Sequence, residues 1–247
     1  MKVVLFCGGL GLRMGPASRR VPKPMVRIGG RPILWHIMSL YAGYGFRDFV
    51  LCVGHRAEVI RRHFVRSDEV RSGEWSVELV DTGSHAPVGE RLRRVAPHLE
   101  GEEVFLANYG DVLTDAPLDE MVRVLSESGR SALLLAARPR YNFHVLDVGA
   151  GGLVGGIRDV TTTDLRINGG FFVFRWEVLA SIREGEDLVD EPFRRLIEAD
   201  QLLSYPYDGF WAPMDTLKDH QLLESLHRSG KAPWLRRPTR SRAAAVA

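Results

Sequence analysis

The sequence contains few cysteines, no long hydrophobic run and no large excess of charge of one sign. Two cysteines, Cys7 and Cys52, stand in 247 residues, far below the cysteine density of a disulfide-stabilised secreted domain. Both lie in apolar, strand-like runs, so we expect a cytoplasmic protein. Cys7 precedes a glycine-rich segment, which suggests a nucleophile. No histidine or other general base lies near it in the sequence, so we interpret Cys7 as a small buried side chain.

The sequence also has no apolar stretch of the roughly 20 residues that a membrane-spanning helix needs. Residues 1–7 lack the basic region and the long apolar region of a signal peptide. The net charge is +2, which gives no general reason to expect nucleic acid as a partner. We therefore expect a soluble protein with no membrane partner and no nucleic-acid partner.

Histidine spacing typical of zinc sites is missing as well. None of the eight histidines forms an H-x-x-x-H pair, so the sequence does not predict a zinc centre. His36 has apolar neighbours on a predicted helix, and we interpret it as a core or interface histidine.

What the sequence does contain is an alternation of apolar strand-like runs and amphipathic segments. With 45% hydrophobic and 26% charged residues, this pattern predicts one α/β domain, Rossmann-like, with a mostly parallel central sheet and helices on both faces. The expected strands are residues 2–7, 48–53, 76–80, 103–108 and 132–137. The expected helices are one opened by Pro32 and others at 57–65, 118–128 and 216–227.

The pattern changes after residue 137. Short strand-like pieces at 145–148, 153–157 and 167–174 predict a small antiparallel annex, about 138–175, laid over the sheet edge. We expect residues 1–234 to form a single domain and 235–247 to be a flexible basic tail. A basic arm for nucleic acid is the alternative for that tail.

The first 25 residues carry the strongest functional signal. An apolar strand leads into a segment with Gly8, Gly9 and Gly11, and Arg13 and Lys23 follow. Glycines permit close approach of the backbone to an anion, and the two cations would surround it, so this segment predicts a phosphate loop. The segment matches neither a Walker A loop nor a dinucleotide fingerprint. The alternatives are an ordinary strand-to-helix turn and two solvated surface charges.

The order Gly-Gly-x-Gly-x-Arg at 8–13, followed by Lys-Pro-Met at 23–25, resembles the signature of the sugar-1-phosphate nucleotidylyltransferases. Segments at 32–38, 168–173, 209–217 and 230–234 look like the glucose-1-phosphate cytidylyltransferase branch, so the resemblance extends from residue 1 to about Trp234. It implies a nucleotide-diphospho-sugar transferase fold, an annex that walls off the sugar, and a homo-oligomer. It also implies Mg²⁺-dependent transfer of a nucleotidyl group from an NTP, with CTP favoured, to a sugar 1-phosphate such as glucose 1-phosphate or a modified hexose or heptose 1-phosphate, with release of pyrophosphate.

In-line nucleotidyl transfer requires positioning and neutralisation of phosphate charge more than covalent chemistry by the protein. Asp111 ends the buried run at 104–111, and Asp215 follows the segment at 210–214. Mg²⁺ prefers one or two carboxylates together with substrate phosphates, and both aspartates match metal positions of the family. Alone, Asp111 could be a turn or cap residue and Asp215 could be a helix N-cap.

The resemblance assigns further residues by position. The expected catalytic residues are Arg13 and Lys23, and the expected metal ligands are Asp111 and Asp215. The expected nucleotide-binding residues are Leu5, Gly8, Gly9, Gly11, Arg13, Thr82, Gly83, Gly89, Arg91 and Asp111. The expected sugar-phosphate-binding residues are Tyr109, His144, Arg158, Arg166, Asn168, Gly169 and Trp211. A solvated helix face is the alternative for Arg91 with Arg93 and Arg94, and a plain turn is the alternative for the segment at 168–170.

Three positions depart from the family pattern. Leu12 replaces a threonine beside the arginine, and Phe143-His144 replaces Phe-Gly. The lysine of a Glu-Lys-Pro tripeptide, which binds the sugar phosphate in the family, has no counterpart here. Either Arg158 or Arg166 supplies its charge from a shifted position, or the acceptor is bound differently, or the acceptor is not glucose 1-phosphate.

The segment between residues 64 and 78 is also shorter than the excursion that contacts neighbouring subunits in this branch. The departures leave two alternatives: the same reaction with dTTP, UTP, ATP or GTP, and a binding or regulatory module without turnover.

Overall fold

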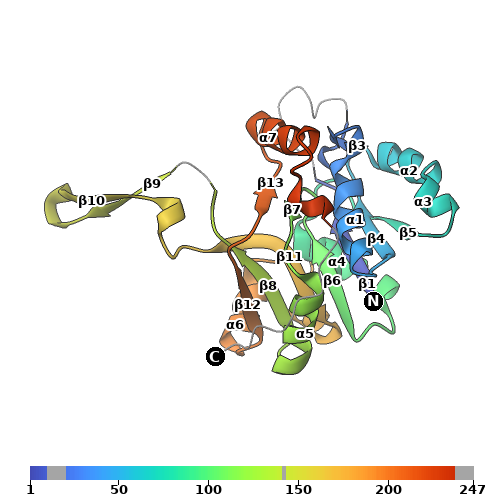
Figure 1. Ribbon diagram of the computed structural model, residues 1–247. Coiled ribbons are helices and arrows are strands. Elements are labelled where there is room, and N and C mark those ends of the chain that lie inside the picture. Colours follow the sequence, from blue (N-terminus) through green and yellow to red (C-terminus); the bar gives the residue numbers. More distant parts are fainter. Residues whose placement is uncertain (10–20, 141–142, 237–247) are drawn as a thin grey trace.

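The computed structural model describes residues 1–9, 21–140 and 143–236. A seven-stranded sheet in the order β12-β8-β11-β6-β1-β4-β5 forms its centre (Figure 1). The strands of this sheet are β1 (Lys2–Phe6), β4 (Asp48–Val53), β5 (Ser76–Asp81), β6 (Val104–Asn108), β8 (Ala132–Ala137), β11 (Ile167–Arg175) and β12 (Leu202–Tyr207). The shorter strands pair as β2 (Arg27–Ile28) with β3 (Arg31–Pro32), β7 (Val112–Thr114) with β13 (Trp211–Pro213), and β9 (His144–Val148) with β10 (Val154–Asp159).

Seven α-helices occur in the described part of the chain. They are α1 (Ile33–Gly43), α2 (Ala57–Val65), α3 (Asp68–Arg71), α4 (Val88–Arg94), α5 (Leu118–Ser128), α6 (Glu191–Glu198) and α7 (Leu217–Arg228). Short 3₁₀ turns include η2 (Lys23–Met25), η3 (Ala96–Leu99), η6 (Trp176–Ser181) and η7 (Pro233–Leu235). No helix among the described residues is both long enough and apolar enough to cross a membrane.

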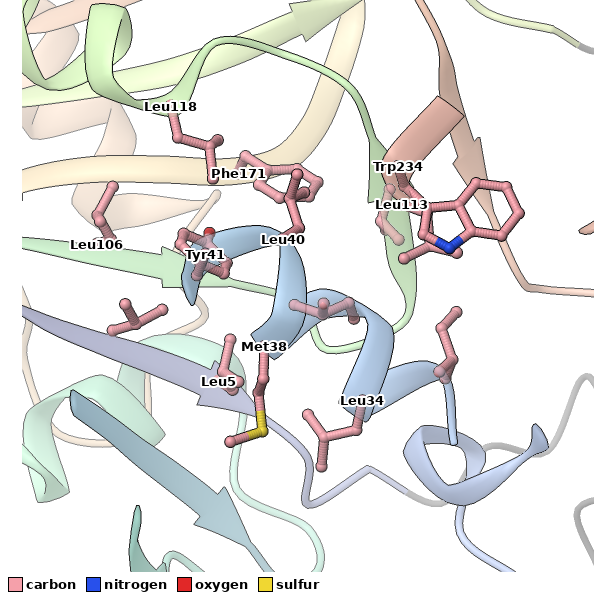
Figure 2. Close-up of a cluster of buried hydrophobic side chains, with 14 of the residues drawn as sticks. Leu5, Leu34, Met38, Leu40, Tyr41, Leu106, Leu113, Leu118, Phe171 and Trp234 are labelled. Carbon is pink, nitrogen blue, oxygen red and sulfur yellow. The ribbon is translucent and has the colours of Figure 1, made fainter. Parts of the chain in front are cut away.

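Helices cover both faces of the central sheet, as the sequence predicts. Successive residues of β1 point to opposite faces: Val3 and Leu5 join one buried cluster, while Val4 and Phe6 join the other. The first cluster contains side chains of α1, α2, α5 and α7, and the second contains side chains of α4, η3, η6 and α6. Figure 2 shows part of the first cluster, including Leu34 and Tyr41 of α1 and Leu5 and Phe171 of the sheet. Strands buried on both faces are typical of doubly wound α/β folds.

The strand directions bring several loops to one edge of the sheet. β1 runs parallel to both β4 and β6, and β4 runs parallel to β5. The segments after β1, β5 and β6 therefore leave at the same edge, which is where ligands bind in open α/β sheets. β11 runs antiparallel to β6 and β8, so its amino end lies at this edge too.

The predicted position of residues 167–174 was wrong. The sequence prediction placed them in the antiparallel annex, whereas β11 lies inside the central sheet between β6 and β8. Six consecutive residues of β11, from Gly169 to Phe174, are buried, which requires cover on both faces and two neighbouring strands.

The antiparallel annex is thus smaller than predicted. It consists of the β9–β10 hairpin, which projects away from the body of the molecule (Figure 1). The hairpin is not laid over the sheet edge as predicted: β9 and β10 pair with each other in a separate two-stranded sheet, and the edge strands of the central sheet are β12 and β5.

Several helix boundaries follow from local chemistry. Helices α2 and α5 have the predicted bounds. Thr216 caps α7: its side chain accepts a hydrogen bond from the Asp219 backbone, and Asp219 accepts one from the Thr216 backbone, which forms a capping box. α7 therefore starts one residue after the predicted boundary. Residues 237–247, which make up most of the predicted basic tail, lie outside the described residues.

Candidate active site

A cavity of about 660 Å³ opens at the sheet edge where β1, β5 and β6 end. Its walls come from five separate segments of the chain. The lining residues are Phe6, Cys7, Gly9, Lys23, Pro24, Ser84, His85, Ala86, Pro87, Val88, Arg91, Tyr109, Asp111 and Asp187. This set combines a glycine-rich backbone segment, two cations and two carboxylates, which suits a ligand with several phosphates.

The segment after β1 packs directly on the guanidinium of Arg91. A β-carbon added to Gly8 would lie 1.8 Å from Arg91 Nη1, so a larger residue at position 8 would have to displace the guanidinium. Arg91 is 4% exposed, and it donates from Nη1 to Thr82 Oγ1 at 2.8 Å and from Nη2 to the Ser84 carbonyl at 3.4 Å. Arg91 is therefore a fixed cation at the cavity wall and not part of a solvated helix face.

The neighbouring arginines behave differently. Arg93 and Arg94 both pair with Glu90 at 2.7 Å, and these bonds hold the pKa of Glu90 down at about 2. Gly89 is buried where α4 packs on the loop before α6, because a β-carbon there would lie 2.6 Å from the Glu186 carbonyl. This part of α4 is a packing element that presents Arg91 to the cavity.

Lys23 lies between the two predicted metal ligands. Its Nζ is 2.6 Å from Asp111 Oδ2 and 2.6 Å from Asp215 Oδ1. Burial lowers the pKa of Lys23, but the charges and hydrogen bonds of both aspartates outweigh burial and leave the pKa above its ordinary value. The ammonium is therefore charged, and both carboxylates contact it.

The backbone fixes the two aspartates relative to each other. Gly110 has φ +78°, and a β-carbon on it would lie 2.7 Å from the Phe6 carbonyl, so glycine is needed to turn the chain into Asp111. The Met214 N–H donates to the Asp111 carbonyl at 2.9 Å. β7 and β13 pair antiparallel with Val112 opposite Pro213, so Asp111 directly precedes β7 and Asp215 lies two residues after β13. This pairing holds the two aspartates near each other.

The donor set fits a magnesium ion that is shared with a substrate. Among the described residues, no group of three or more His, Cys, Asp or Glu side chains could hold a metal. The pair Asp111 and Asp215 offers two carboxylates that already share one cation, and Mg²⁺ commonly takes one or two carboxylates and completes its octahedron with phosphates and water.

Hydrogen bonds join the predicted sugar segment to β6. Asn168 Nδ2 donates to the Tyr109 hydroxyl at 2.9 Å, and Asn168 Oδ1 accepts from the Gly170 N–H at 2.9 Å. Asn108, fully buried, donates to the Gly170 carbonyl at 3.0 Å. Burial raises the pKa of Tyr109 to about 12, so the hydroxyl stays protonated beside the cavity.

The indole of Trp211 also contacts the segment at 168–170. Its Nε1 donates to the Gly169 carbonyl at 2.8 Å, and the residue is 5% exposed. Trp211 therefore holds the segment at 168–170 in place, and its own surface is largely enclosed by protein.

The structure separates other predicted site residues from the cavity. Leu5 is fully buried in β1, and Thr82 is fully buried with its hydroxyl on the Val53 carbonyl at 3.0 Å, where it orients Arg91. His144 and Arg158 lie on the projecting β9–β10 hairpin, and Arg158 pairs with Asp147 at 2.7 Å. The predicted residues Gly11 and Arg13, and Leu12, lie outside the described residues.

Arg166 occupies a different place from Arg158. It precedes β11 at the sheet edge, donates to the Tyr207 carbonyl at 2.9 Å and pairs with Asp208 at 2.8 Å. Arg138 pairs with the same carboxylate at 2.6 Å, so two guanidiniums share Asp208.

Some residues at the site were missing from the sequence prediction. Residues 84–88 line the cavity and lie between two predicted segments, Thr82-Gly83 and Gly89. Their place between these segments was the signal in the sequence that could have identified them. Asn108 ends a buried strand, where a polar residue indicates a specific partner. No sequence motif around Asp187 or Arg138 indicated a role at the site. Only the tertiary structure brings their segments to this edge of the sheet.

The fold is a Rossmann-like sheet, and its cavity is lined by glycine backbone, a buried arginine and two carboxylates. This combination is typical of α/β proteins that bind nucleotides and transfer phosphoryl or nucleotidyl groups. A family model described as Nucleotidyl transferase matches residues 2–222. The chain therefore belongs to the nucleotidyl transferase family, as the resemblance to sugar-1-phosphate nucleotidylyltransferases predicts.

Individual relatives narrow the class. The chain is 38% identical to the glucose-1-phosphate cytidylyltransferase of Salmonella typhimurium, over 95% of this chain and 98% of that protein. It is 30% identical to a probable glucose-1-phosphate cytidylyltransferase of Bacillus subtilis, over 95% of this chain and 99% of that protein. These relatives confirm the predicted class of sugar-1-phosphate nucleotidylyltransferases.

Solved structures confirm the predicted fold. A UTP-bound UGPase from Acinetobacter baumannii matches with a TM-score of 0.71 at 18% identity, covering 92% of each chain. A putative glucose-1-phosphate thymidylyltransferase from Bacillus anthracis matches with a TM-score of 0.70 at 16% identity, covering 92% of this chain and 95% of that chain.

Proposed function

We propose that this protein transfers CMP from CTP to glucose 1-phosphate, giving CDP-glucose and pyrophosphate. The observation that carries the proposal is the cluster of Lys23, Asp111 and Asp215 at the wall of a cavity that Arg91 also lines. The choice of CTP and glucose 1-phosphate rests on the 38% identity to a glucose-1-phosphate cytidylyltransferase over nearly the full length of both chains.

The chemistry needs no general base, because the attacking oxygen belongs to an ionised sugar phosphate. This oxygen attacks the α-phosphorus of the triphosphate in line, and pyrophosphate leaves. Lys23 and Arg91 neutralise phosphate charge, and the glycine backbone at 8–9 permits close approach of the triphosphate. Asp111 and Asp215 would hold Mg²⁺, which supplies charge neutralisation and aligns the phosphates when bound.

We assign the sugar-binding half of the site to the region around Tyr109 and the segment at 168–170. Tyr109 lines the cavity and is bonded to Asn168, so sugar hydroxyls at this place meet a phenol, an amide and the backbone of the segment at 168–170. Arg166 lies two residues before Asn168, whereas Arg158 lies on the projecting hairpin. We therefore assign the charge of the missing family lysine to Arg166.

We also propose that the protein works as a homo-oligomer of the cytoplasm. The β9–β10 hairpin carries Leu146, Val148, Val154 and Ile157 on one face, each between 49% and 64% exposed. Two strands alone are marginally stable in water, so a second copy that covers this face would stabilise the hairpin. Cys7 and Cys52 are free and buried, which suits a reducing compartment.

The experiment is pyrophosphate release with Mg²⁺, with CTP, dTTP, UTP, ATP and GTP crossed against a panel of sugar 1-phosphates. We expect release with CTP and glucose 1-phosphate at the highest kcat/KM. Release with another pair would assign a different base or sugar to the same chemistry. No release with any pair would overturn the proposal and favour a binding module without turnover.

A further inference from the structure

We propose that the Lys23 ammonium occupies the place of the divalent cation in the nucleotide-free protein, so that this protein takes up its metal only together with the nucleotide. The inference rests on the proposed function in one respect: it takes Asp111 and Asp215 as the metal ligands. It goes beyond that function because it gives Lys23 a second task, which is to keep the site closed to free metal.

The geometry of the cluster carries the proposal. The Lys23 Nζ lies 2.6 Å from one oxygen of Asp111 and 2.6 Å from one oxygen of Asp215. Mg²⁺ binds carboxylate oxygens at about 2.0–2.1 Å, so an ion and the ammonium cannot lie between these two oxygens together. One cation must leave before the other binds.

Burial makes this competition strong. The Lys23 side chain is 9% exposed, and the side chains of Asp111 and Asp215 are 24% and 22% exposed, so water screens the three charges poorly. A bare ion that entered would also separate the ammonium from the two carboxylates that it contacts. A triphosphate brings negative charge to the cavity that Lys23 lines and so offers the ammonium a new partner.

The backbone around Lys23 limits how it can respond. Lys23 stands between Pro22 and Pro24 in η2, where the Met25 N–H donates to the Pro22 carbonyl at 2.8 Å and the Val26 N–H donates to the Lys23 carbonyl at 3.1 Å. Proline fixes φ, so this turn is stiff. The ammonium therefore moves from the carboxylates to a phosphate by side-chain rotation alone.

The test measures metal binding to the nucleotide-free protein, with Mn²⁺ as the probe, by electron paramagnetic resonance and calorimetry. Lys23→Met keeps most of the length of the side chain and removes the charge, and we expect it to bind one Mn²⁺ at least tenfold more tightly than the unchanged protein. Lys231→Met, at an exposed position, is the matched control and should leave Mn²⁺ binding unchanged. The double variant Lys23→Met with Asp111→Asn should lose the gained affinity.

A second measurement on the unchanged protein guards against a variant that does not fold. If the nucleotide-free protein binds Mn²⁺ tightly and Asp111→Asn abolishes that binding, the proposal is overturned without any Lys23 variant. Equal Mn²⁺ affinity in folded Lys23→Met and in the unchanged protein also overturns it. The two proposals can fail separately. If the unchanged protein does not make CDP-glucose but Lys23→Met gains Mn²⁺ affinity, the proposed function is refuted and this inference stands.

Discussion

Trp234 donates its indole N–H to Nδ1 of His36 at 3.2 Å, across 198 positions of the sequence. Indole nitrogen can only donate, so Nδ1 of His36 carries no proton and Nε2 donates to the Ile28 carbonyl, 2.8 Å away. The ring is 1% exposed, and it fastens η7 to α1 and to the β2–β3 turn. The histidine is thus a core residue, as the sequence predicts, in a single neutral tautomer.

This arrangement predicts a loss of stability in mild acid. Burial lowers the pKa of His36 below its ordinary value of 6.5, although the hydrogen bond to the Ile28 carbonyl partly opposes the shift. The unfolded chain therefore binds the proton more readily, and the stability that neutral His36 contributes is complete above about pH 6.5. It falls as the pH drops from there through the folded pKa.

Urea unfolding midpoints between pH 5 and 8 check this prediction. His36→Gln should lower the free energy of unfolding at pH 8 by about 1–3 kcal/mol and flatten its dependence on pH. His144→Gln, on the exposed hairpin, is the control and should keep the original dependence. An unchanged slope in His36→Gln would show that other groups cause the acid sensitivity.

Gly8→Ala tests the contact between the phosphate loop and Arg91. The new methyl group would lie 1.8 Å from Arg91 Nη1 and must displace a buried guanidinium, so we expect a destabilisation of about 1–3 kcal/mol and weaker CTP binding. A β-carbon on Gly9 meets nothing within 4 Å, so Gly9→Ala should change the free energy of unfolding by less than about 0.5 kcal/mol. Equal effects of the two substitutions in urea titrations would contradict the packing described for Gly8.

Asp111→Asn and Asp215→Asn test the assignment of the metal ligands. Each removes one charged oxygen ligand while keeping the shape of the side chain, and we expect kcat to fall about 100-fold or more with the fold intact by circular dichroism. Asp68→Asn, at an exposed position on α3, should retain full activity. Full activity in Asp111→Asn would remove Asp111 from the reaction.

Arg166→Gln and Arg158→Gln separate the two candidates for the charge that binds the sugar phosphate. A charge-assisted hydrogen bond contributes about 1.5–3 kcal/mol, so Arg166→Gln should raise KM for glucose 1-phosphate by about 10-fold or more with little change in KM for CTP. Arg158→Gln should behave like the unchanged protein, because Arg158 is 58% exposed on the projecting hairpin. The opposite ranking in steady-state kinetics would place the sugar phosphate at the hairpin.

Leu146→Asp with Ile157→Asp tests the hairpin as a contact between copies. The two residues are cross-strand partners, so the paired charges would face any second copy seated there. We expect a lower molar mass when the variant is measured by size-exclusion chromatography with light scattering. Asp147→Asn, on the opposite face of the same strand, should leave the mass unchanged. A double variant that keeps the full mass would place the oligomer interface elsewhere.

The sequence by itself predicted several of the helices and strands and some of the residues that line the cavity. The bounds of α2 and α5 follow from local periodicity, and the glycines, Lys23 and Asp111 follow strands that the apolar runs reveal. These signals are local, because a helix or a strand end depends on a few neighbouring residues.

Only the tertiary structure decided which segments meet. It placed β11 inside the sheet, buried Arg91 under Gly8, and brought Lys23 within 2.6 Å of Asp215, 192 positions away. Strand order and contacts between distant segments depend on the whole set of buried surfaces. The same apolar pattern fits an annex strand or a central strand, so the amino-acid sequence alone could not choose between them.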